Sequence, residues 1–312
     1  MKKVTIGVPT YRRPKDLRHC LQSIVESGLR PSQVIVGDDS PSAETNNVIK
    51  GFEKVLPIEH IKNFGDSSMI NNIYSIIDHA EGEWLSIIHD DDFFLPEVKK
   101  IRSLFPVSDF IFSDHWAASP EGKVLRRETS ASSRRYGRNL ITEGLQPDPI
   151  NLFLKGSVCL DGFFVKTSIA KSIPRSVRNK FTGDWLMVAR LIQSSRSVYF
   201  LKNRIFAYRL SSDSITSRRW DSSLFYEDLC QLNFENKEHV TLLNNLKLNN
   251  APRAVSDYLR HGQYAKAKEL LNSKSYPSLL DASMLWRRLI QSMLIFLPNK
   301  IRTTILNNHP QI

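Results

Sequence analysis

The chain has 312 residues, of which 41% are hydrophobic and 24% charged. This balance allows a substantial buried core and excludes a disordered chain. The formal net charge of +11 favours an anionic partner such as nucleic acid, an acidic membrane surface or a phosphorylated small molecule. Neither a recognition helix nor an aromatic RNA-binding motif accompanies the basic residues, so nucleic acid is not an expected partner. Cys20, Cys159 and Cys230 lack paired spacing, which argues against a zinc site and favours reduced thiols in the cytosol.

Short apolar runs alternate with amphipathic segments over the first 114 residues. Residues 4–8 are β-rich, and their early proline indicates a first strand and no secretory signal peptide. Further strands are expected at 33–37, 58–61, 84–88 and 110–114, with helices beginning near residues 14, 43, 69 and 96 between them. This order predicts an α/β fold with a mostly parallel, Rossmann-like sheet flanked by helices.

The regular alternation ends after residue 114. Residues 119–144 are polar and basic, which predicts a hairpin and a long loop. Order is expected to return at 149–154, followed by a strand at 156–166, a turn at 181–184, a helix at 185–192 and one or two strands at 198–210. Beyond Trp220 the pattern is helical. We therefore expect one domain over residues 1–218 and a helical C-terminal extension over residues 219–312.

Residues 284–297 are very apolar but too short to span a bilayer, which takes about 20 mostly apolar residues. Two interpretations remain open for this segment. It is either an interfacial helix, anchored on a membrane by Trp286 and the bases near Lys300 and Arg302, or a helix that packs on the main domain or on a second subunit.

Carboxylates follow two of the expected strands. Asp90, Asp91 and Asp92 come after the apolar run 84–88, and Asp38 and Asp39 follow the second strand. Ligands of open α/β sheets bind beyond the carboxyl ends of the strands, and hard oxygen ligands there suit Mg²⁺ or Mn²⁺ and a phosphate-bearing substrate. The alternative is a solvated acidic turn before a helix that begins near Pro96.

Four motifs occur in a fixed order, at residues 8–13, 38–40, 80–84 and 90–92. Together they resemble the family 2 glycosyltransferases with the GT-A fold, over roughly the first two thirds of the chain. The resemblance implies a nucleoside diphosphate sugar donor, with UDP-sugar the expected one, and a Mn²⁺ or Mg²⁺ cofactor. The residues that it assigns to the donor are Pro9, Tyr11, Arg13, Asp38, Asp39 and Asp90, and those that it assigns to the metal are Asp91 and Asp92. Among them Tyr11 would stack, Arg13 would bind phosphate, Asp39 would accept from the base, and Asp92 is the preferred direct metal ligand.

The resemblance also implies an acceptor side. Thr182-Gly183-Asp184-Trp185 is similar to the family segment that supplies a general base, so Asp184 is the candidate for inverting transfer to a hydroxyl. Its alternative role is an N-cap of the following helix, and Asp161 is the next candidate base. The acceptor would be a saccharide or lipid-linked glycan in polysaccharide or cell-surface glycan synthesis. Sugar transfer would take place in the cytoplasm, with the inner face of the membrane as an alternative location.

The late segment 208–216 departs from the family pattern, because Ser211 stands where a metal-binding His is expected. Either the metal does without that ligand or Asp213 takes part. Two alternative functions are less consistent with the sequence. A nucleotidyltransferase should carry a glycine-rich phosphate loop after the first strand, and residues 9–14 contain no glycine. A basic, non-enzymatic nucleic-acid or membrane binding protein would not need Asp39, the acidic triplet and Asp184 together.

Overall fold

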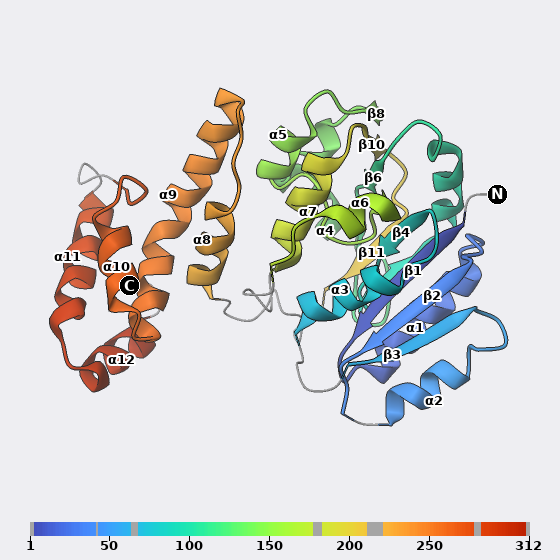
Figure 1. The fold of residues 1–312 in the computed structure, drawn as a ribbon, viewed down its shortest axis with the longest axis horizontal. Helices are drawn as coiled ribbons and strands as arrows, with labels where there is room; N and C mark the ends of the chain where they lie inside the picture. Colours follow the sequence, from blue (N-terminus) through green and yellow to red (C-terminus); the bar gives the residue numbers. More distant parts are fainter. Residues whose placement is uncertain are drawn as a thin grey trace. The chain divides into compact units, whose positions relative to one another are not determined.

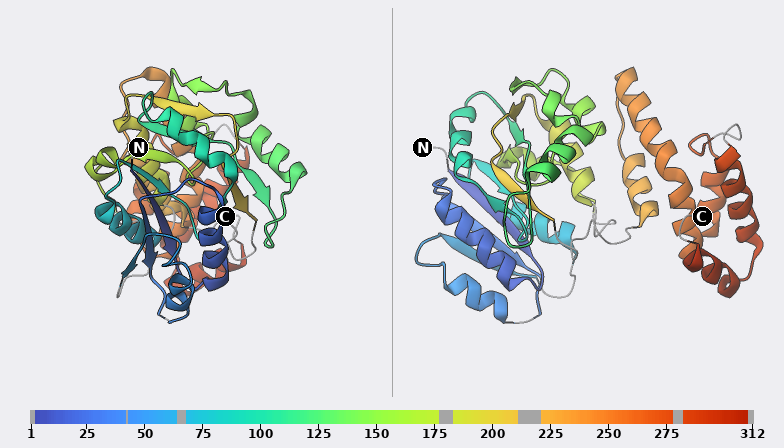
Figure 2. Two further views of the ribbon diagram at one scale, coloured as in Figure 1. Left: turned by 90° about the vertical axis from the view of Figure 1, so that its right-hand side faces the viewer. Right: turned by 180° about the vertical axis from the view of Figure 1, so that it is seen from behind.

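The structure is a computed structural model that describes residues 3–41, 43–63, 68–176, 183–210, 221–277 and 282–309. The chain folds into two compact units, an N-terminal unit, Met1–Arg218, and a C-terminal unit, Arg219–Ile312. The first unit is built from strands and helices, and the described part of the second is helical (Figures 1 and 2).

The N-terminal unit is organised around an eight-stranded sheet with the order β3-β2-β1-β4-β9-β6-β10-β8. Strand β1 runs parallel to β2 and β4, β2 runs parallel to β3, and β6 runs parallel to β10, whereas β9 and β8 are antiparallel to their neighbours. The predicted mostly parallel α/β sheet is therefore confirmed. Its strands are β1 (Val4–Thr10), β2 (Gln33–Asp38), β3 (Ile58–Lys62), β4 (Trp84–Ile87), β6 (Phe110–Ser113), β8 (Gly144–Leu145), β9 (Phe164–Lys166) and β10 (Val198–Leu201).

Successive side chains of β1 point to opposite faces of this sheet, because side chains alternate along a strand. Val4, Ile6 and Val8 are buried in one core with α1 (Pro14–Glu26), α2 (Glu44–Lys50) and η1 (Pro96–Leu104), a 3₁₀ helix where the sequence predicted an ordinary helix. The other face receives α3 (Met69–His79), which approaches so closely that a Cβ on Gly7 would lie 2.3 Å from the Ile76 side chain.

A second sheet of three strands supports the end of β4. Its order is β5-β11-β7, formed by β5 (Phe93–Phe94), β11 (Phe206–Arg209) and β7 (Trp116–Ala118). Strand β5 begins at the residue after Asp92, and it pairs antiparallel with β11. The acidic triplet is thereby held between two sheets, which the sequence did not predict.

The prediction of a long loop over residues 119–144 was wrong. A bridge between Ala118 and Val124 closes the expected hairpin, but α4 (Arg126–Arg135) and η2 (Arg138–Leu140) follow it. The Thr129 hydroxyl accepts from the Ala117 N–H at 2.9 Å and donates to the Leu125 carbonyl at 2.7 Å. This tertiary bond fixes a polar helix that its own sequence pattern does not indicate.

The segment after η2 also differs from expectation. The strand predicted at 156–166 is limited to β9, and it lies between two short helices, α5 (Pro149–Leu154) and α6 (Thr167–Ser172). Helix α7 (Gly183–Ser194) begins two residues earlier than predicted. Residues 181 and 182 of the predicted turn lie outside the described residues.

The C-terminal unit has its own apolar core, formed mainly by α9, α10 and residues of α11 and α12. Its helices are α8 (Ser222–Cys230), α9 (Lys237–Arg260), α10 (Tyr264–Leu271), α11 (Ala282–Phe296) and α12 (Asn299–Asn308). Within the described part of the chain, we find no helix with both the length and the apolar content required to cross a bilayer.

Candidate active site

The carboxyl ends of β1, β2 and β4 meet at one edge of the large sheet. Because these strands are parallel and adjacent, Thr10 at the end of β1, Asp38 at the end of β2 and the triplet after β4 share that edge. Pro9 lies one residue before the edge, buried inside β1 and paired with Gly37. Open α/β sheets bind their ligands in a crevice just beyond this edge.

Asp90 and Asp91 face the loop that follows β1. The Thr10 hydroxyl donates to Asp90 Oδ2 at 2.6 Å, and Arg13 Nη1 contacts Asp90 Oδ1 at 3.4 Å and also binds Asp91 Oδ2. Burial, with the adjacent Asp91 charge as a second cause, raises the pKa of Asp90 to about 7. The guanidinium of Arg13 therefore forms ion pairs with both carboxylates.

Asp92 is the last residue of the acidic triplet. It is fully buried, and its Oδ1 accepts from the Arg209 backbone N–H at 2.8 Å, while Oδ2 has no hydrogen-bond partner in the described part of the chain. Burial, followed by the neighbouring carboxyl group of Asp161, raises its pKa. A buried carboxylate oxygen without a partner is costly, so it is suited to receive a cation or a proton.

His89 and Asp161 complete a cluster with Asp92. One ligand atom of each residue lies within 4.8 Å of the others, and the His89 backbone N–H donates to Asp161 Oδ1 at 3.1 Å. Burial raises the pKa of Asp161 to about 6. The sequence assigned no role to His89 and indicated Asp161 only as the next candidate base. The feature of the sequence that could have indicated this cluster is the position of His89 directly before the triplet.

The remaining residues that were predicted to bind the donor lie where β1 and β2 end. Asp38 is buried, its Oδ1 accepts from the Ser40 N–H at 2.8 Å and its Oδ2 lies 3.2 Å from His60 Nε2. Asp39 Oδ1 accepts from Asn63 Nδ2 at 2.9 Å. Asp38 therefore stabilises its own loop, and Asp39 follows it directly in the chain.

Tyr11 belongs to the same edge and has an exposed side chain. The guanidinium of Arg12 lies 5.0 Å from the centre of its ring, and the Arg12 N–H donates to Ser40 Oγ at 2.8 Å. This bond joins the loop after β1 to the loop after β2. An exposed aromatic ring on a tethered loop is a suitable platform for a planar ligand.

Asp184 lies in the first turn of α7 and is buried, with its Oδ1 accepting from the Trp185 N–H at 2.9 Å. Burial raises its pKa, and a smaller, opposite effect comes from the charge of His89. The electrostatic link to His89 connects Asp184 with the cluster of Asp92 and Asp161. The late segment is described only as far as Leu210, so Ser211 and Asp213 lie outside the described residues.

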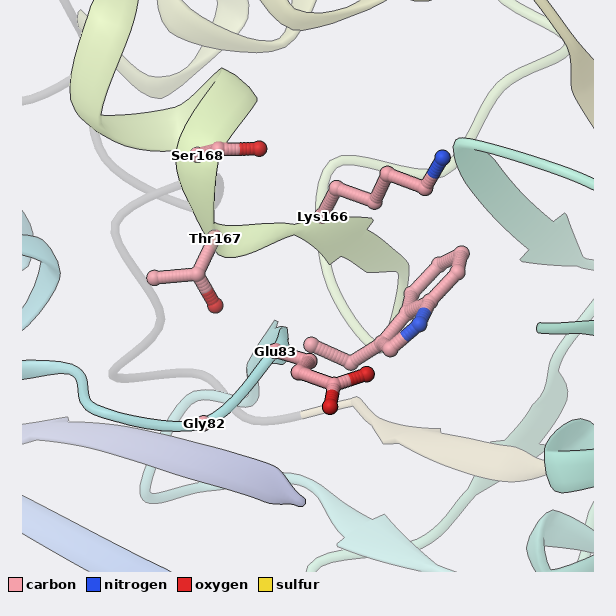
Figure 3. A pocket seen from close by; sticks show the side chains of 6 residues that line it. Gly82, Glu83, Lys166, Thr167 and Ser168 are labelled. Atoms are coloured by element: carbon pink, nitrogen blue, oxygen red, sulfur yellow. The ribbon is translucent and has the colours of Figure 1, made fainter. Parts of the chain in front are cut away.

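A separate pocket of about 380 Å³ lies at the amino end of β4, lined by residues 82–84 and 166–168 (Figure 3). Trp84 begins β4 and pairs with Lys166 of the antiparallel strand β9. The acidic triplet follows the other end of β4. This pocket is therefore not part of the carboxyl-end site.

Residues 5–138 match the model of the glycosyl transferase family 2. This part of the chain is a family 2 glycosyltransferase domain. The resemblance predicted from the strand-end motifs is confirmed, and the matched residues contain the triplet and the loops that follow β1 and β2. Asp161 and Asp184 lie beyond the family 2 match.

Two curated relatives align with parts of the chain that carries this family 2 domain. The uncharacterized glycosyltransferase YwdF of Bacillus subtilis (strain 168) is 30% identical over 122 residues, which cover 39% of this chain and 45% of that protein. The GalNAc(5)-diNAcBac-PP-undecaprenol beta-1,3-glucosyltransferase of Campylobacter jejuni is 30% identical over 99 residues, which cover 30% of each protein. The matches thus span less than half of either relative.

Solved structures share the fold of the chain at low identity. S. aureus TarS 1–349 in complex with UDP-GlcNAc has a TM-score of 0.64 and 15% identity, over 98% of this chain and 92% of that one. Mannosyltransferase PcManGT from Pyrobaculum calidifontis, in complex with GDP-Man and Mn²⁺, has a TM-score of 0.56 and 13% identity, over 100% and 88%. These likenesses confirm the predicted GT-A fold.

Proposed function

We propose that this protein transfers a sugar from a nucleoside diphosphate sugar, a UDP-sugar, to a hydroxyl group of a glycan or lipid-linked acceptor with inversion at the anomeric carbon. The observation that carries the proposal is the meeting of Arg13, Asp90 and Asp91 at the carboxyl edge of a family 2 fold. One cation and several acids at that edge suit a diphosphate with a bound metal ion.

The donor would lie across the ends of β1 and β2. Tyr11 offers an exposed ring for stacking on the base, and Asp39 offers a carboxylate for a base N–H. Arg13 would exchange its contacts with Asp90 and Asp91 for the diphosphate. Pro9 is buried, so its part would be to shape the strand end. TarS with UDP-GlcNAc supports a donor of this class.

The side chains at this edge fit a divalent ion. Asp91 is partly exposed beside Asp90, Asp92 has an unpartnered buried oxygen, and all three are hard oxygen donors suited to Mn²⁺ or Mg²⁺. We propose that Asp91 and Asp92 hold the ion, while Asp90 stays with Thr10 near the ribose. The bound ion would neutralise charge on the departing diphosphate. PcManGT with GDP-Man and Mn²⁺ supports a metal of this kind.

The acceptor hydroxyl would lose its proton to Asp184. A general base works best when its pKa lies near the working pH, and burial shifts the pKa of Asp184 upward in that direction. A single displacement assisted by one base inverts the anomeric centre. Asp161 is less suitable, because its Oδ1 accepts from the His89 N–H and the residue lies beside Asp92 in the cluster.

The nature of the acceptor draws support from the Campylobacter relative, whose name specifies an undecaprenol-linked glycan. Such an acceptor is anchored in a bilayer, so we also propose that the protein works from the cytoplasm at the inner face of the membrane. The surface for that contact would belong to the C-terminal unit.

Thermal unfolding with and without ligand tests the donor proposal. A ligand that binds only the native state adds about 2.7 kcal/mol of stability at a hundredfold excess over Kd. We expect a rise in Tm with UDP plus Mn²⁺ that exceeds the effects of UDP alone, Mn²⁺ alone and AMP plus Mn²⁺. A screen of UDP- and GDP-sugars for metal-dependent hydrolysis would then identify the sugar. No stabilisation by any nucleotide with Mn²⁺ or Mg²⁺ would refute the proposal.

A further inference from the structure

Helix α11 presents an apolar strip to solvent. Trp286 is 70% exposed, Leu289 48%, Met293 69% and Phe296 83%. With 3.6 residues per turn, this spacing places the four side chains within about 80° of the helix circumference. Exposed apolar groups scattered singly are ordinary, but a continuous strip of this kind marks an interaction surface.

The opposite side of α11 is fixed inside the C-terminal unit. Gln291 is fully buried, its Nε2 donates to the Pro252 carbonyl at 2.7 Å and to Ser256 Oγ at 2.8 Å, and its Oε1 accepts from the Tyr276 hydroxyl at 2.6 Å. A polar side chain held by three buried bonds resists rotation of the helix, since each unmade bond would leave an unsatisfied group. The apolar strip therefore cannot turn inward without breaking this network.

Charge decides between the possible occupants of the strip. Residues 282–312 contain Arg287, Arg288, Lys300 and Arg302 but no aspartate or glutamate. Arg302 is buried and donates to the carbonyls of Leu294 and Ile295 at the end of α11, whereas Lys300 is exposed and Arg287 and Arg288 are half-buried. Neither α11 nor α12 contains an acid with which a second copy, docked strip to strip, could pair the exposed Lys300. An anionic lipid surface complements them instead.

We propose that α11 lies in the interface of an anionic membrane, with Trp286, Leu289, Met293 and Phe296 inserted among the lipids. The proposal rests on the membrane location proposed above but not on sugar transfer. Trp286 is an aromatic residue of the kind that anchors helices at the headgroup level. Lys300 adds electrostatic attraction to anionic headgroups, so binding should weaken as salt rises.

Flotation of the full chain with lipid vesicles tests this proposal. We expect binding to vesicles of phosphatidylglycerol and phosphatidylcholine, and much weaker binding to pure phosphatidylcholine. The partition coefficient of the double variant Trp286→Gln/Phe296→Gln should be at least about tenfold lower. The apolar area that each substitution removes is larger than the area whose burial changes partitioning tenfold. The matched control is Val55→Gln/Leu140→Gln, which replaces two similarly exposed apolar residues of the N-terminal unit.

Three results would overturn the proposal. They are absence of binding by the unaltered chain at low salt, binding to pure phosphatidylcholine as strong as to the anionic vesicles, and equal binding by the double variant. In the last case, a dimer that the double variant abolishes would identify a second copy as the occupant of the strip. The UDP-dependent rise in Tm should be the same in both variants and in the unaltered chain. A loss of that rise in all three proteins would refute donor binding alone and leave the membrane result valid.

Discussion

Replacement of Asp184 by asparagine separates a catalytic role from a structural one. Asn retains an oxygen that can accept from the Trp185 N–H, so the bond at 2.9 Å can persist. It cannot remove a proton from an acceptor hydroxyl. General base catalysis contributes roughly 10²–10⁴-fold, so we expect transfer to fall by that factor, which corresponds to about 2.7–5.4 kcal/mol in the barrier.

The stability of Asp184→Asn should change little, and its pH dependence has a definite sign. Burial raises the pKa of Asp184, so the stability it contributes is fully present below its unfolded pKa and is lost as pH rises through the folded value. Asn has no charge to bury. We therefore expect the free energy of unfolding of the variant, relative to that of the unaltered chain, to increase as pH rises above the unfolded pKa of aspartate.

The assay measures initial rates of transfer of a labelled sugar, from the nucleotide sugar found by screening, to acceptors in a membrane extract. Binding of UDP plus Mn²⁺ is measured in parallel. The matched control is Asp148→Asn, because Asp148 caps α5 by accepting from the Asn151 N–H at 3.0 Å and lies outside the site. Near-full transfer by Asp184→Asn would refute its role as base, and Asp161→Asn would be tested next. A loss of donor binding would also contradict the reasoning.

Three further predictions concern the metal, a buried histidine and a packed glycine. Asp91→Asn and Asp92→Asn should each weaken Mn²⁺-dependent UDP binding at least about tenfold in titration calorimetry; unchanged affinity in either variant would remove that residue from the ligand set. His115, whose pKa burial lowers to about 4, should make the chain lose stability as pH falls from 6.5 towards 4. Urea unfolding should show a loss of up to about 3 kcal/mol that is absent in His115→Gln, and equal pH profiles would contradict this. Gly37→Ala should cost about 1–3 kcal/mol in the same assay, because its Cβ would lie 1.9 Å from Asn72 Oδ1; an unchanged midpoint would contradict the packing of α3 on β2.

The parallel half of the large sheet could be predicted because its signals are local. Each strand is a short apolar run followed directly by its functional residues, so Tyr11, Asp39 and the triplet are adjacent in sequence to the strand ends that carry them. Side-chain period and order along the chain then suffice to place them at one edge. Asp184 was found only through the family resemblance, since an acid at the start of a helix has an ordinary structural explanation.

The cluster around Asp92 could not be predicted, because it depends on a turn between distant segments. The Gly162 N–H donates to the Ile87 carbonyl at 3.0 Å, and this contact docks Asp161 beneath the triplet. Gly162 has a φ of +66°, and a Cβ there would lie 2.5 Å from the Phe206 ring, so the turn requires glycine. The pattern of residues 156–166 indicated a strand, which would have kept Asp161 extended.

The small sheet was missed for a related reason. Strand β5 has only two residues, and its partner β11 lies more than a hundred residues later in the chain. No periodic pattern exists in a two-residue strand, so only the tertiary pairing defines it. Likewise, the polar helix α4 depends on the bond between Thr129 and the Ala117 N–H.

The span from Ile87 to Phe93 has a fixed length, because one end belongs to the large sheet and the other to the small one. One residue more or fewer would shift the register of β5 against β11 and turn Phe93 and Phe94 to opposite faces. Engineering of this segment is therefore restricted to replacement of side chains. If residues 90–92 bind the donor and the metal as proposed, substitutions among residues 88–92 should alter the donor or metal preference, whereas insertions and deletions there should yield protein that does not fold.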